Sequence, residues 1–361
     1  MVHFVLSDAV YPYRVGGMEV FNYYLIRELS KNEKIYYSSS HCLPFNSCHH
    51  YHLFPLRPTK IFNPFQVFLF HLLHPSVKNV VFSYSAAHWL LWSLYSWIIR
   101  IFNLNAIAVI HYGWRPDDSN HPERIRRFFS ACNHIFAVSE DIKKNYDSQF
   151  DVNCKIVYPL VPFLKSSLSQ KEARLKYGIP NNRFVICMVG SLKGMKNPQT
   201  ILESLLLLSQ NDISEYNPHI VYAGDGPLRE PLQIFAVHNN LSDRVSFLGN
   251  VPKENVSEIM ALSDCYLIAS DFEGTSVSVL EAMSNRMPII YSNSPGLNNM
   301  LEDGLTGLAF TNKDATALMT VLLKLLQNEK YRFNLGENAY RQYVNKYNYK
   351  TILAAFVDAF K

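Results

Sequence analysis

Two glutamates eight residues apart carry the clearest chemical signal in this sequence. Glu273 and Glu281 flank a Gly-Thr-Ser turn, and the apolar segment 266–269 precedes them. This pattern predicts a strand, a tight polar loop and a helix, with Glu273 at the carboxyl end of the strand. The amides of residues 274–276 would lie at the helix N-terminus, where backbone N–H groups can hold a phosphate. Glu281, two turns into the helix, would accept hydrogen bonds from two neighbouring hydroxyls, so the segment suits a nucleotide sugar.

Three further positions could serve the same ligand. Lys196 follows the apolar segment 184–189 and lies at the entry to a predicted helix, where a cation can meet a diphosphate. Gly16 and Gly17 open another predicted helix, and paired glycines let a backbone approach a ligand closely. His111 ends an apolar strand, and in parallel sheets ligands bind at the carboxyl ends of strands. The competing interpretation is structural: a solvated lysine, an ordinary helix start and a lone histidine, and a short motif by itself does not exclude it.

The bulk composition predicts a globular protein of two domains. The chain has 361 residues, of which 48% are hydrophobic and 18% charged, so a large core is expected and disorder is not. The net charge of +4 is too small to suggest nucleic-acid binding. The six dispersed cysteines fit buried thiols in a reducing cytosol better than a disulfide framework. Because no charged segment followed by an apolar one opens the chain, we expect no signal peptide and a cytoplasmic location.

Strand-like and helix-like segments alternate almost throughout, which is typical of an α/β fold with parallel, doubly wound sheets. We expect a Rossmann-like domain over 1–160, a linker over 161–170 and a second Rossmann-like domain over 171–345. A closing helix in 346–361 would pack back on the first domain. Ligands of two such domains are expected in a central crevice that the strand carboxyl ends face. The better defined helices are predicted at 18–29, 89–101, 122–129, 140–146, 197–208, 256–262, 315–326 and 331–346.

Two aromatic-rich segments raise the question of a membrane. Residues 80–99 carry no full charge, but their serines and their division into a strand and a helix argue against a spanning helix. The helix contains Trp89, Trp92 and Trp97, and the segment 65–73 is equally apolar. The two helices would either form a surface that lies on a membrane or simply cover the sheet. Both interpretations stay open at the level of sequence.

A metal site is not expected. Two cysteines and three histidines cluster near residue 50, but their spacing fits no standard zinc pattern: Cys42, Cys48, His49, His50 and His52. The sequence also has no Asp-x-Asp motif, and Lys196 can supply positive charge in place of a metal.

The segments 274–283, 288–292 and 304–308, taken in series, resemble the donor-binding half of retaining glycosyltransferases of the GT-B fold, and family 4 (glycosyl transferases group 1) most of all. The resemblance covers most of the second domain and scattered points of the first. It implies two Rossmann-like domains and transfer of a sugar from a UDP- or GDP-linked donor to an acceptor hydroxyl with retention. It implies neither a cofactor nor a metal.

The resemblance also assigns roles to residues. Glu273 and His111 would contact the transferred sugar, Glu281 would hold the ribose, and Lys196 would stabilise the departing diphosphate. The remaining donor-side positions are Gly16, Gly17, Ser191, Val251 (beside the base), Gly274, Thr275 and Ser276, and the acceptor-side positions are Arg14, Trp114 and Arg115. The sequence departs from the family pattern at Ser191, where many relatives have Arg, and at 298–299, where many have Glu.

The aromatic helices and the basic residues of the first domain predict a glycan or lipid-linked glycan acceptor. This would place the protein at the inner face of a bacterial cytoplasmic membrane, as a peripheral enzyme of O-antigen, capsule or exopolysaccharide synthesis. Two alternatives remain. A non-catalytic sugar-nucleotide-binding subunit would explain Ser191 and the missing acidic residue near Asn299, and a GT-B-fold epimerase would release its product without an acceptor.

Overall fold

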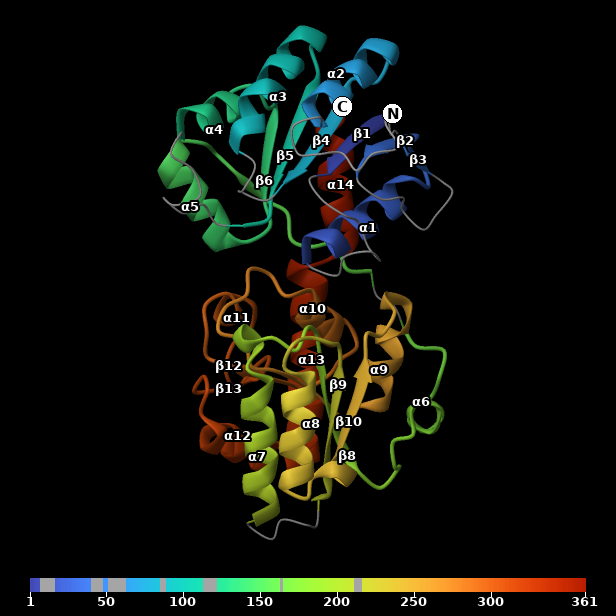
Figure 1. The fold of residues 1–361 in the computed structure, drawn as a ribbon, viewed down its shortest axis with the longest axis vertical. Helices are drawn as coiled ribbons and strands as arrows, with labels where there is room; N and C mark the ends of the chain where they lie inside the picture. Colours follow the sequence, from blue (N-terminus) through green and yellow to red (C-terminus); the bar gives the residue numbers. More distant parts are fainter. Residues whose placement is uncertain are drawn as a thin grey trace. The chain divides into compact units, whose positions relative to one another are not determined.

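The computed structural model describes residues 1–6, 17–39, 48–50, 63–84, 89–112, 122–162, 165–210 and 216–361. These residues divide into two compact units (Figure 1). Unit 1 comprises Met1–Pro162 together with Asn348–Lys361, and unit 2 comprises Phe163–Tyr347. The last segment of the chain is therefore part of the first unit.

Unit 1 is built on a parallel sheet with the strand order β3-β2-β1-β4-β5-β6-β7 among the described residues. Its central strands are runs of Val, Ile, Phe and Ala that are buried on both faces, as expected of a sheet covered by helices on each side. The strands are β1 (Val2–Leu6), β2 (Ile35–Ser38), β3 (Cys48–His50), β4 (Asn79–Tyr84), β5 (Asn105–Ile110), β6 (His134–Ala137) and β7 (Lys155–Ile156). The helices are α1 (Gly17–Leu29), α2 (Asn63–Leu73), α3 (Trp89–Phe102), α4 (Pro122–Phe129), α5 (Glu140–Phe150) and α14 (Tyr349–Ala359).

The C-terminal helix α14, red in Figure 1, lies among the elements of unit 1. Phe356 is completely buried and packs edge-on against Phe136, with ring centroids 5.0 Å apart. Asn105 Nδ2 donates a 2.7 Å hydrogen bond to the carbonyl of Ala359, near the end of the helix. This helix therefore completes the core of a unit from which it is separated by nearly 200 residues of sequence.

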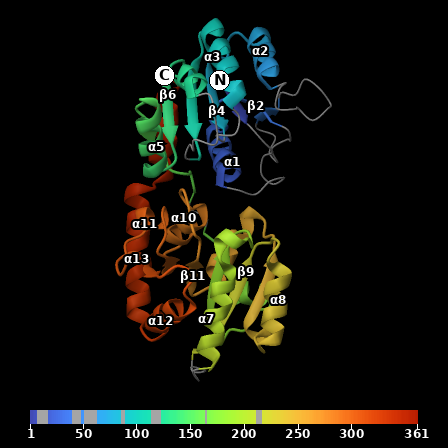
Figure 2. The same ribbon diagram turned by 60° about the vertical axis from the view of Figure 1, so that its left-hand side comes forward.

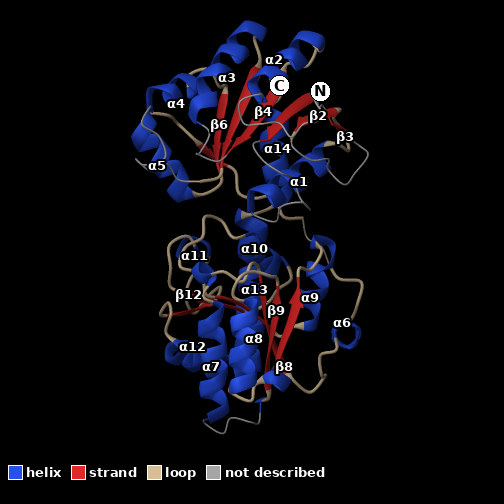
Figure 3. Ribbon diagram, viewed as in Figure 1, coloured by secondary structure: helices blue, strands red, loops and turns tan. Residues whose placement is uncertain are grey.

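Unit 2 repeats the architecture with a parallel sheet of order β10-β9-β8-β11-β12-β13. Figures 2 and 3 show helices on both faces of this sheet. The strands are β8 (Phe184–Val189), β9 (Pro218–Ala223), β10 (Val245–Gly249), β11 (Cys265–Ile268), β12 (Ile289–Ser292) and β13 (Leu308–Phe310). The helices are α6 (Gln170–Tyr177), α7 (Pro198–Gln210), α8 (Arg229–His238), α9 (Val256–Leu262), α10 (Val277–Ser284), α11 (Leu297–Met300), α12 (Ala315–Leu326) and α13 (Glu329–Lys346), with short 3-10 turns η3 (Gly194–Lys196), η5 (Ser242–Arg244) and η6 (Lys253–Asn255).

In each unit the order of the first six strands is 3-2-1-4-5-6, the doubly wound order of dinucleotide-binding folds. The chain therefore leaves the first and fourth strands of each sheet in opposite directions. Loops at this topological switch point diverge and leave room for a ligand. The switch points are β1/β4 in unit 1 and β8/β11 in unit 2.

Some local expectations need correction. The interpretation that Trp92 faces a membrane is wrong, because its side chain is 6% exposed and packs edge-on against Phe128 in α4. The predicted linker 161–170 overlaps α6, which begins at Gln170 with a capping box formed by Ser169 and Glu172. The short strands β2, β3, β7, β12 and β13 were not anticipated.

A chain of buried histidines lies in unit 1. His71 Nδ1 donates to the carbonyl of Val77 at 3.2 Å, which leaves its Nε2 as an acceptor for His3 Nδ1, also at 3.2 Å. His3 Nε2 in turn accepts from Ser38 Oγ at 2.9 Å. This series of hydrogen bonds is complete only when both imidazole rings are neutral, because a protonated ring has two donors and no acceptor. Burial lowers the pKa of His3 well below its usual value and that of His71 to about 4.

Unit 1 should therefore lose stability as the pH falls from about 6.5 to about 4. In this window the unfolded chain binds protons that the folded chain excludes, so the free energy of unfolding decreases with decreasing pH. Denaturant unfolding followed by tryptophan fluorescence measures this unit alone, because all four tryptophans lie in its part of the sequence: Trp89, Trp92, Trp97 and Trp114.

Two variants calibrate this experiment. His71→Gln keeps an acceptor and a donor but does not titrate, so its unfolding should depend less steeply on pH. His238→Gln, at an exposed histidine of unit 2, should behave as the wild type. Equal slopes in the wild type and His71→Gln would show that the buried histidine chain does not control acid stability.

Candidate active site

Two of the predicted active-site residues of unit 2, Lys196 and Glu273, lie together at its topological switch point. Lys196 lies in η3, directly after β8, and Glu273 lies in the loop after the adjacent strand β11. The Lys196 ammonium forms an ion pair with Oε1 of Glu273, and Ser270 Oγ donates a 2.7 Å hydrogen bond to the same oxygen. Their side chains are 23% and 12% exposed, so the pair is largely shielded from water. A lysine and a carboxylate 77 positions apart in the sequence thus share one site.

The backbone around Lys196 is held by the residue that follows it. Asn197 has a left-handed backbone (φ 43°), a conformation that asparagine tolerates better than most residues. Its side-chain Nδ2 donates to the carbonyl of Ala269 at 2.9 Å and to Asp271 Oδ1 at 2.6 Å. The amide of Asp271 donates to the carbonyl of Met195 at 2.9 Å. These bonds join the loop after β8 to the loop after β11 and set the position of the Lys196 side chain.

The backbone of Glu273 is held in place by contacts with the turn that follows β12. Its amide donates to the carbonyl of Pro295 at 3.2 Å, and Ser292 Oγ donates to the carbonyl of Ser270 at 2.7 Å. Gly296 has φ +84°, and a Cβ at this position would lie 1.7 Å from the carbonyl oxygen of Glu273. Only glycine permits this approach, so the turn after β12 fixes the Glu273 backbone by direct contact.

The amides at the start of α10 are only partly available to a phosphate. Ser276 is the N-cap residue, but its amide donates to Met300 Sδ at 3.2 Å. The predicted role of the Ser276 amide in diphosphate binding would require this weak bond to break. A Cβ on Gly274 would meet no atom within 4 Å, so the space beside that turn is open.

Glu281 points from α10 toward the loop after β10. Its Oε1 forms an ion pair with the ammonium of Lys253 in η6, and the two side chains are 9% and 10% exposed. Burial raises the pKa of Tyr266 well above its usual value, with smaller contributions from several groups that include both Glu273 and Glu281. The negative charges of Glu273 and Glu281 therefore both help to raise the pKa of the same phenol, that of Tyr266 in β11.

Two other predicted donor positions have less specific surroundings. Val251 and Ser191 are half-buried in the loops after β10 and β8. Lys193, two residues after Ser191, is exposed. The Gly-Asp-Gly-Pro turn after β9 has a structural role, because a Cβ on Gly224 would lie 1.9 Å from the carbonyl oxygen of Gly190.

His111 in unit 1 directly follows β5 and belongs to a polar group at the β1/β4 switch point. Ser83 Oγ donates to Asn22 Oδ1 at 2.8 Å and therefore accepts from His111 Nε2, at 2.9 Å. This arrangement leaves Nδ1 as the acceptor nitrogen of a neutral imidazole. Phe21 packs edge-on against the ring, and burial lowers the pKa of His111 to about 3. The ring is thus neutral at physiological pH and presents an acceptor rather than a positive charge.

Other predicted positions of unit 1 are less informative. Gly17 is the first residue of α1, and a Cβ there would meet no atom within 4 Å. Gly16, Arg14, Trp114 and Arg115 lie outside the described residues. In the part of the chain that the structure describes, no group of three or more His, Cys, Asp or Glu side chains could hold a metal ion, and the cysteines there form no disulfide.

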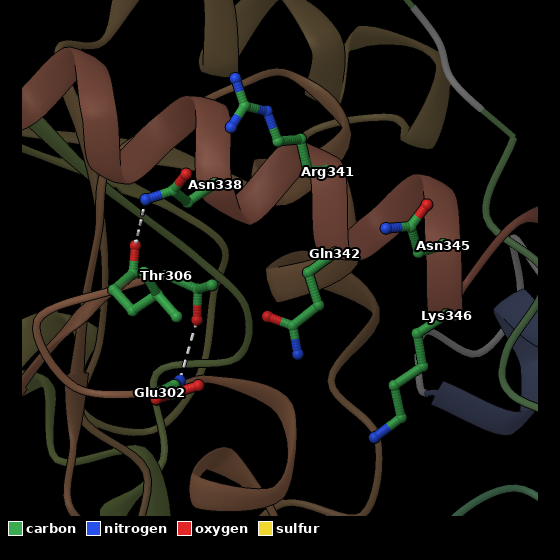
Figure 4. Close-up of a pocket in the computed structure, with 8 residues that line it drawn as sticks. Glu302, Thr306, Asn338, Arg341, Gln342, Asn345 and Lys346 are labelled. Atoms are coloured by element: carbon green, nitrogen blue, oxygen red, sulfur yellow. Dashed lines mark hydrogen bonds between the residues drawn. The ribbon is translucent and has the colours of Figure 1, made fainter.

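A cavity of about 320 Å³ lies beside α13, away from the predicted residues (Figure 4). Its polar lining supports the adjacent turn: Asn338 Nδ2 donates to the carbonyl of Leu305 at 3.1 Å, and Thr306 Oγ1 accepts from the amide of Glu302 at 2.8 Å. Gln342 Nε2 donates to the carbonyl of Met300 at 3.0 Å. The residues around this cavity hold the turn and the helix α11 in place, and Met300 of α11 in turn accepts a hydrogen bond from the amide of Ser276.

The two doubly wound units define the class of protein. A solved structure of the Anabaena protein HepE, in complex with UDP and glucose, superposes with a TM-score of 0.76 at 14% identity and covers 99% of this chain and 98% of that chain. The fold is therefore GT-B, as the sequence predicted. Residues 169–342, which form most of unit 2, match the family model of glycosyl transferases group 1.

Two curated relatives extend the comparison. N-acetyl-alpha-D-glucosaminyl L-malate synthase of Bacillus anthracis is 25% identical over 63% of this chain and 57% of its own length. UDP-Gal:alpha-D-GlcNAc-diphosphoundecaprenol alpha-1,3-galactosyltransferase of Escherichia coli is 27% identical over 47% of this chain and 43% of its own length. The chain thus matches about half the length of these relatives.

Sequence reasoning overlooked three polar residues of the site. Ser83 lies near the end of β4, after the apolar run Val80–Phe82, and Asn22 lies in the helix that follows β1. Both positions could be read from the sequence, but the hydrogen bond between them could not. Lys253 lies in the loop after β10 and was not singled out in the sequence. Its partner Glu281 lies beyond two intervening elements, α9 and β11, so no local pattern connects them.

Proposed function

We propose that this protein is a glycosyltransferase that moves a sugar from a nucleotide diphosphate donor, UDP- or GDP-linked, to a hydroxyl of a glycan or lipid-linked glycan. The observation that carries the proposal is the Lys196–Glu273 pair at the switch point of a group 1 glycosyltransferase domain. Configuration would be retained, and no metal would be needed, because Lys196 provides the cation that a diphosphate leaving group requires.

Lys196 and Glu273 would have different roles in the transfer reaction. As the bond between the sugar and the diphosphate breaks, negative charge grows on the phosphate oxygen and Lys196 stabilises it. Binding of the diphosphate would draw the ammonium away from Glu273, whose carboxylate Ser270 continues to orient. The freed carboxylate would then favour the positive charge that develops on the sugar ring. His111 would accept a hydrogen bond from a sugar hydroxyl at Nδ1, since its Nε2 already donates a hydrogen bond to Ser83.

The experiment that tests this function is thermal unfolding of the full chain against UDP-, GDP-, dTDP- and ADP-sugars. A ligand at about 100 times its dissociation constant adds about 2.7 kcal/mol of stability, which gives a readily measured shift. A shift with one donor that Glu281→Ala abolishes would support the assignment and identify the nucleotide. No shift with any donor would contradict it.

We further propose that the acceptor is lipid-linked and that unit 1 docks on the inner face of the cytoplasmic membrane. Helices α2 and α3 pack together through the stacked rings of Phe68 and Trp97. Their outer surface carries large apolar side chains that are each between 49% and 60% exposed: Phe65, Leu72, Leu73, Leu94, Trp97 and Ile101. Arg100 is exposed on α3, and Lys78 precedes β4. An apolar surface beside cations suits an anionic lipid interface.

This surface would act without crossing the bilayer. Within the described part of the chain, no helix combines the length and apolarity that a membrane crossing requires. The E. coli relative named above acts on a diphosphoundecaprenol-linked sugar, which supports a similar acceptor here. Surface polysaccharide synthesis would be the corresponding role.

Liposome co-sedimentation checks the membrane proposal. The double variant Leu73→Ser/Trp97→Ser should bind anionic vesicles at least about tenfold more weakly, because each buried apolar side chain contributes roughly 1.5–3 kcal/mol. Leu175→Ser is the matched control, since Leu175 is 80% exposed but lies in unit 2. Wild-type protein that stays in the supernatant with anionic vesicles would rule the proposal out.

A further inference from the structure

The ion pair of Lys253 and Glu281 is unusual because both charges are buried. Lys253 begins η6 in the loop after β10, and Glu281 lies in the middle of α10. Each side chain is about a tenth exposed or less. Two ions are costly to remove from water, and such a pair is seldom retained for stability alone, since apolar residues of similar volume often serve as well. Stability alone therefore does not account for the choice of these two residues.

The two oxygens of Glu281 have different surroundings. Oε1 is held by the Lys253 ammonium, whereas Oε2 is sealed from solvent and has no hydrogen-bond partner among the described residues. A carboxylate oxygen without a partner in a buried place is a strong acceptor for a hydroxyl, because little water competes with the ligand. Entry of a ligand hydroxyl would only require displacement of the side chains that cover this oxygen.

The Lys253 ammonium makes this acceptor possible. A buried carboxylate without a counter-charge is so costly that it takes up a proton or turns toward water. Lys253 places its positive charge at Oε1 of Glu281, while Oε2 has no hydrogen-bond partner among the described residues. The lysine is also part of the loop that leads from β10, so the same contact ties this loop to α10.

We propose that Lys253 is a positioning residue for the nucleoside: it holds Glu281 as a carboxylate with one oxygen committed and reserves the other for the ribose hydroxyls. This inference rests on the proposed function, which places the ribose at Glu281. It predicts that discrimination between ribose and deoxyribose in the donor depends on Lys253, although Lys253 need not touch the sugar.

The test is calorimetric binding of UDP and of 2′-deoxy-UDP to the full chain, or of GDP and 2′-deoxy-GDP if the donor screen selects guanine. The wild type should prefer the ribonucleotide by about tenfold, as expected for one hydrogen bond to a charged group. In Lys253→Met this ratio should fall close to one. Lys253→Arg, which keeps the charge, should restore most of the preference.

Two further variants keep the result interpretable. Lys253→Gln has a neutral side chain of similar length and should lose the preference as Lys253→Met does, even if the methionine variant folds poorly. In a Glu281→Gln background, Lys253→Met should change the ratio little, because the lysine acts only through that carboxylate.

The possible failures are distinct. If the wild type discriminates and Lys253→Met and Lys253→Gln discriminate equally well, the inference is wrong while the proposed function stands. If the wild type binds neither nucleotide, the proposed function fails and the inference fails with it.

Discussion

Replacing Lys196 by alanine should lower turnover of the nucleotide sugar by about 10²–10³-fold, which is the usual effect of removing one group that stabilises transition-state charge. The reason is electrostatic: Lys196 is the cation that meets Glu273 at the β8/β11 switch point, and a departing diphosphate needs that charge most when its bond breaks. The loss should appear mainly in kcat. The measurement is release of the nucleoside diphosphate from the donor that the thermal screen identifies.

Lys193→Ala is the matched control for this experiment. Lys193 lies three residues away and is exposed, so its removal should leave kcat within about twofold if it has no catalytic role. A comparable loss in both variants would mean that the general positive charge of the loop matters, rather than the position of Lys196. Near-wild-type turnover in Lys196→Ala would disprove the assignment.

Gly296→Ala should destabilise unit 2 by roughly 3 kcal/mol or more and also weaken donor binding. The added Cβ would lie 1.7 Å from the Glu273 carbonyl oxygen, on a backbone whose φ of +84° already disfavours alanine. Something must move, and the nearest atom belongs to the backbone that carries the candidate catalytic carboxylate. Hydrogen exchange of amides in unit 2 would measure the stability change, since the tryptophans report only on unit 1.

Gly304→Ala separates the two causes of this effect. Gly304 also has a left-handed backbone (φ +75°), but a Cβ there would only approach the Tyr331 hydroxyl, at 3.8 Å. Its substitution should therefore cost only the backbone strain, about 1 kcal/mol. Equal losses in the two variants would show that the contact between Gly296 and Glu273 is unimportant.

Local signals allowed several helices to be predicted to the residue. Residues 122–129, 256–262 and 315–326 form α4, α9 and α12 with the expected bounds. The first begins with a proline, which suits the first position of a helix, and Asp314 caps the last through hydrogen bonds to Thr316 and Ala317. Such contacts reach only a few residues along the chain, and a sequence displays them directly.

The candidate site was predicted in part for the same reason. The strand, loop and helix around Glu273 and Glu281 are consecutive, so their arrangement follows from local pattern, and His111 was expected at the end of its strand. Which carboxylate meets which cation was not predictable. Lys196 pairs with Glu273 and Lys253 with Glu281 because the order of the strands brings separate loops to one edge of the sheet.

By itself, then, the sequence determined the alternation of strands and helices and the residue types of the site, since these depend on neighbours within about ten positions. The tertiary structure alone decided the ion pairs and the nitrogen of His111 that accepts hydrogen bonds. Each of these depends on contacts between segments that are distant in the chain, and such contacts exist only once the hydrophobic effect has packed the sheets and helices together.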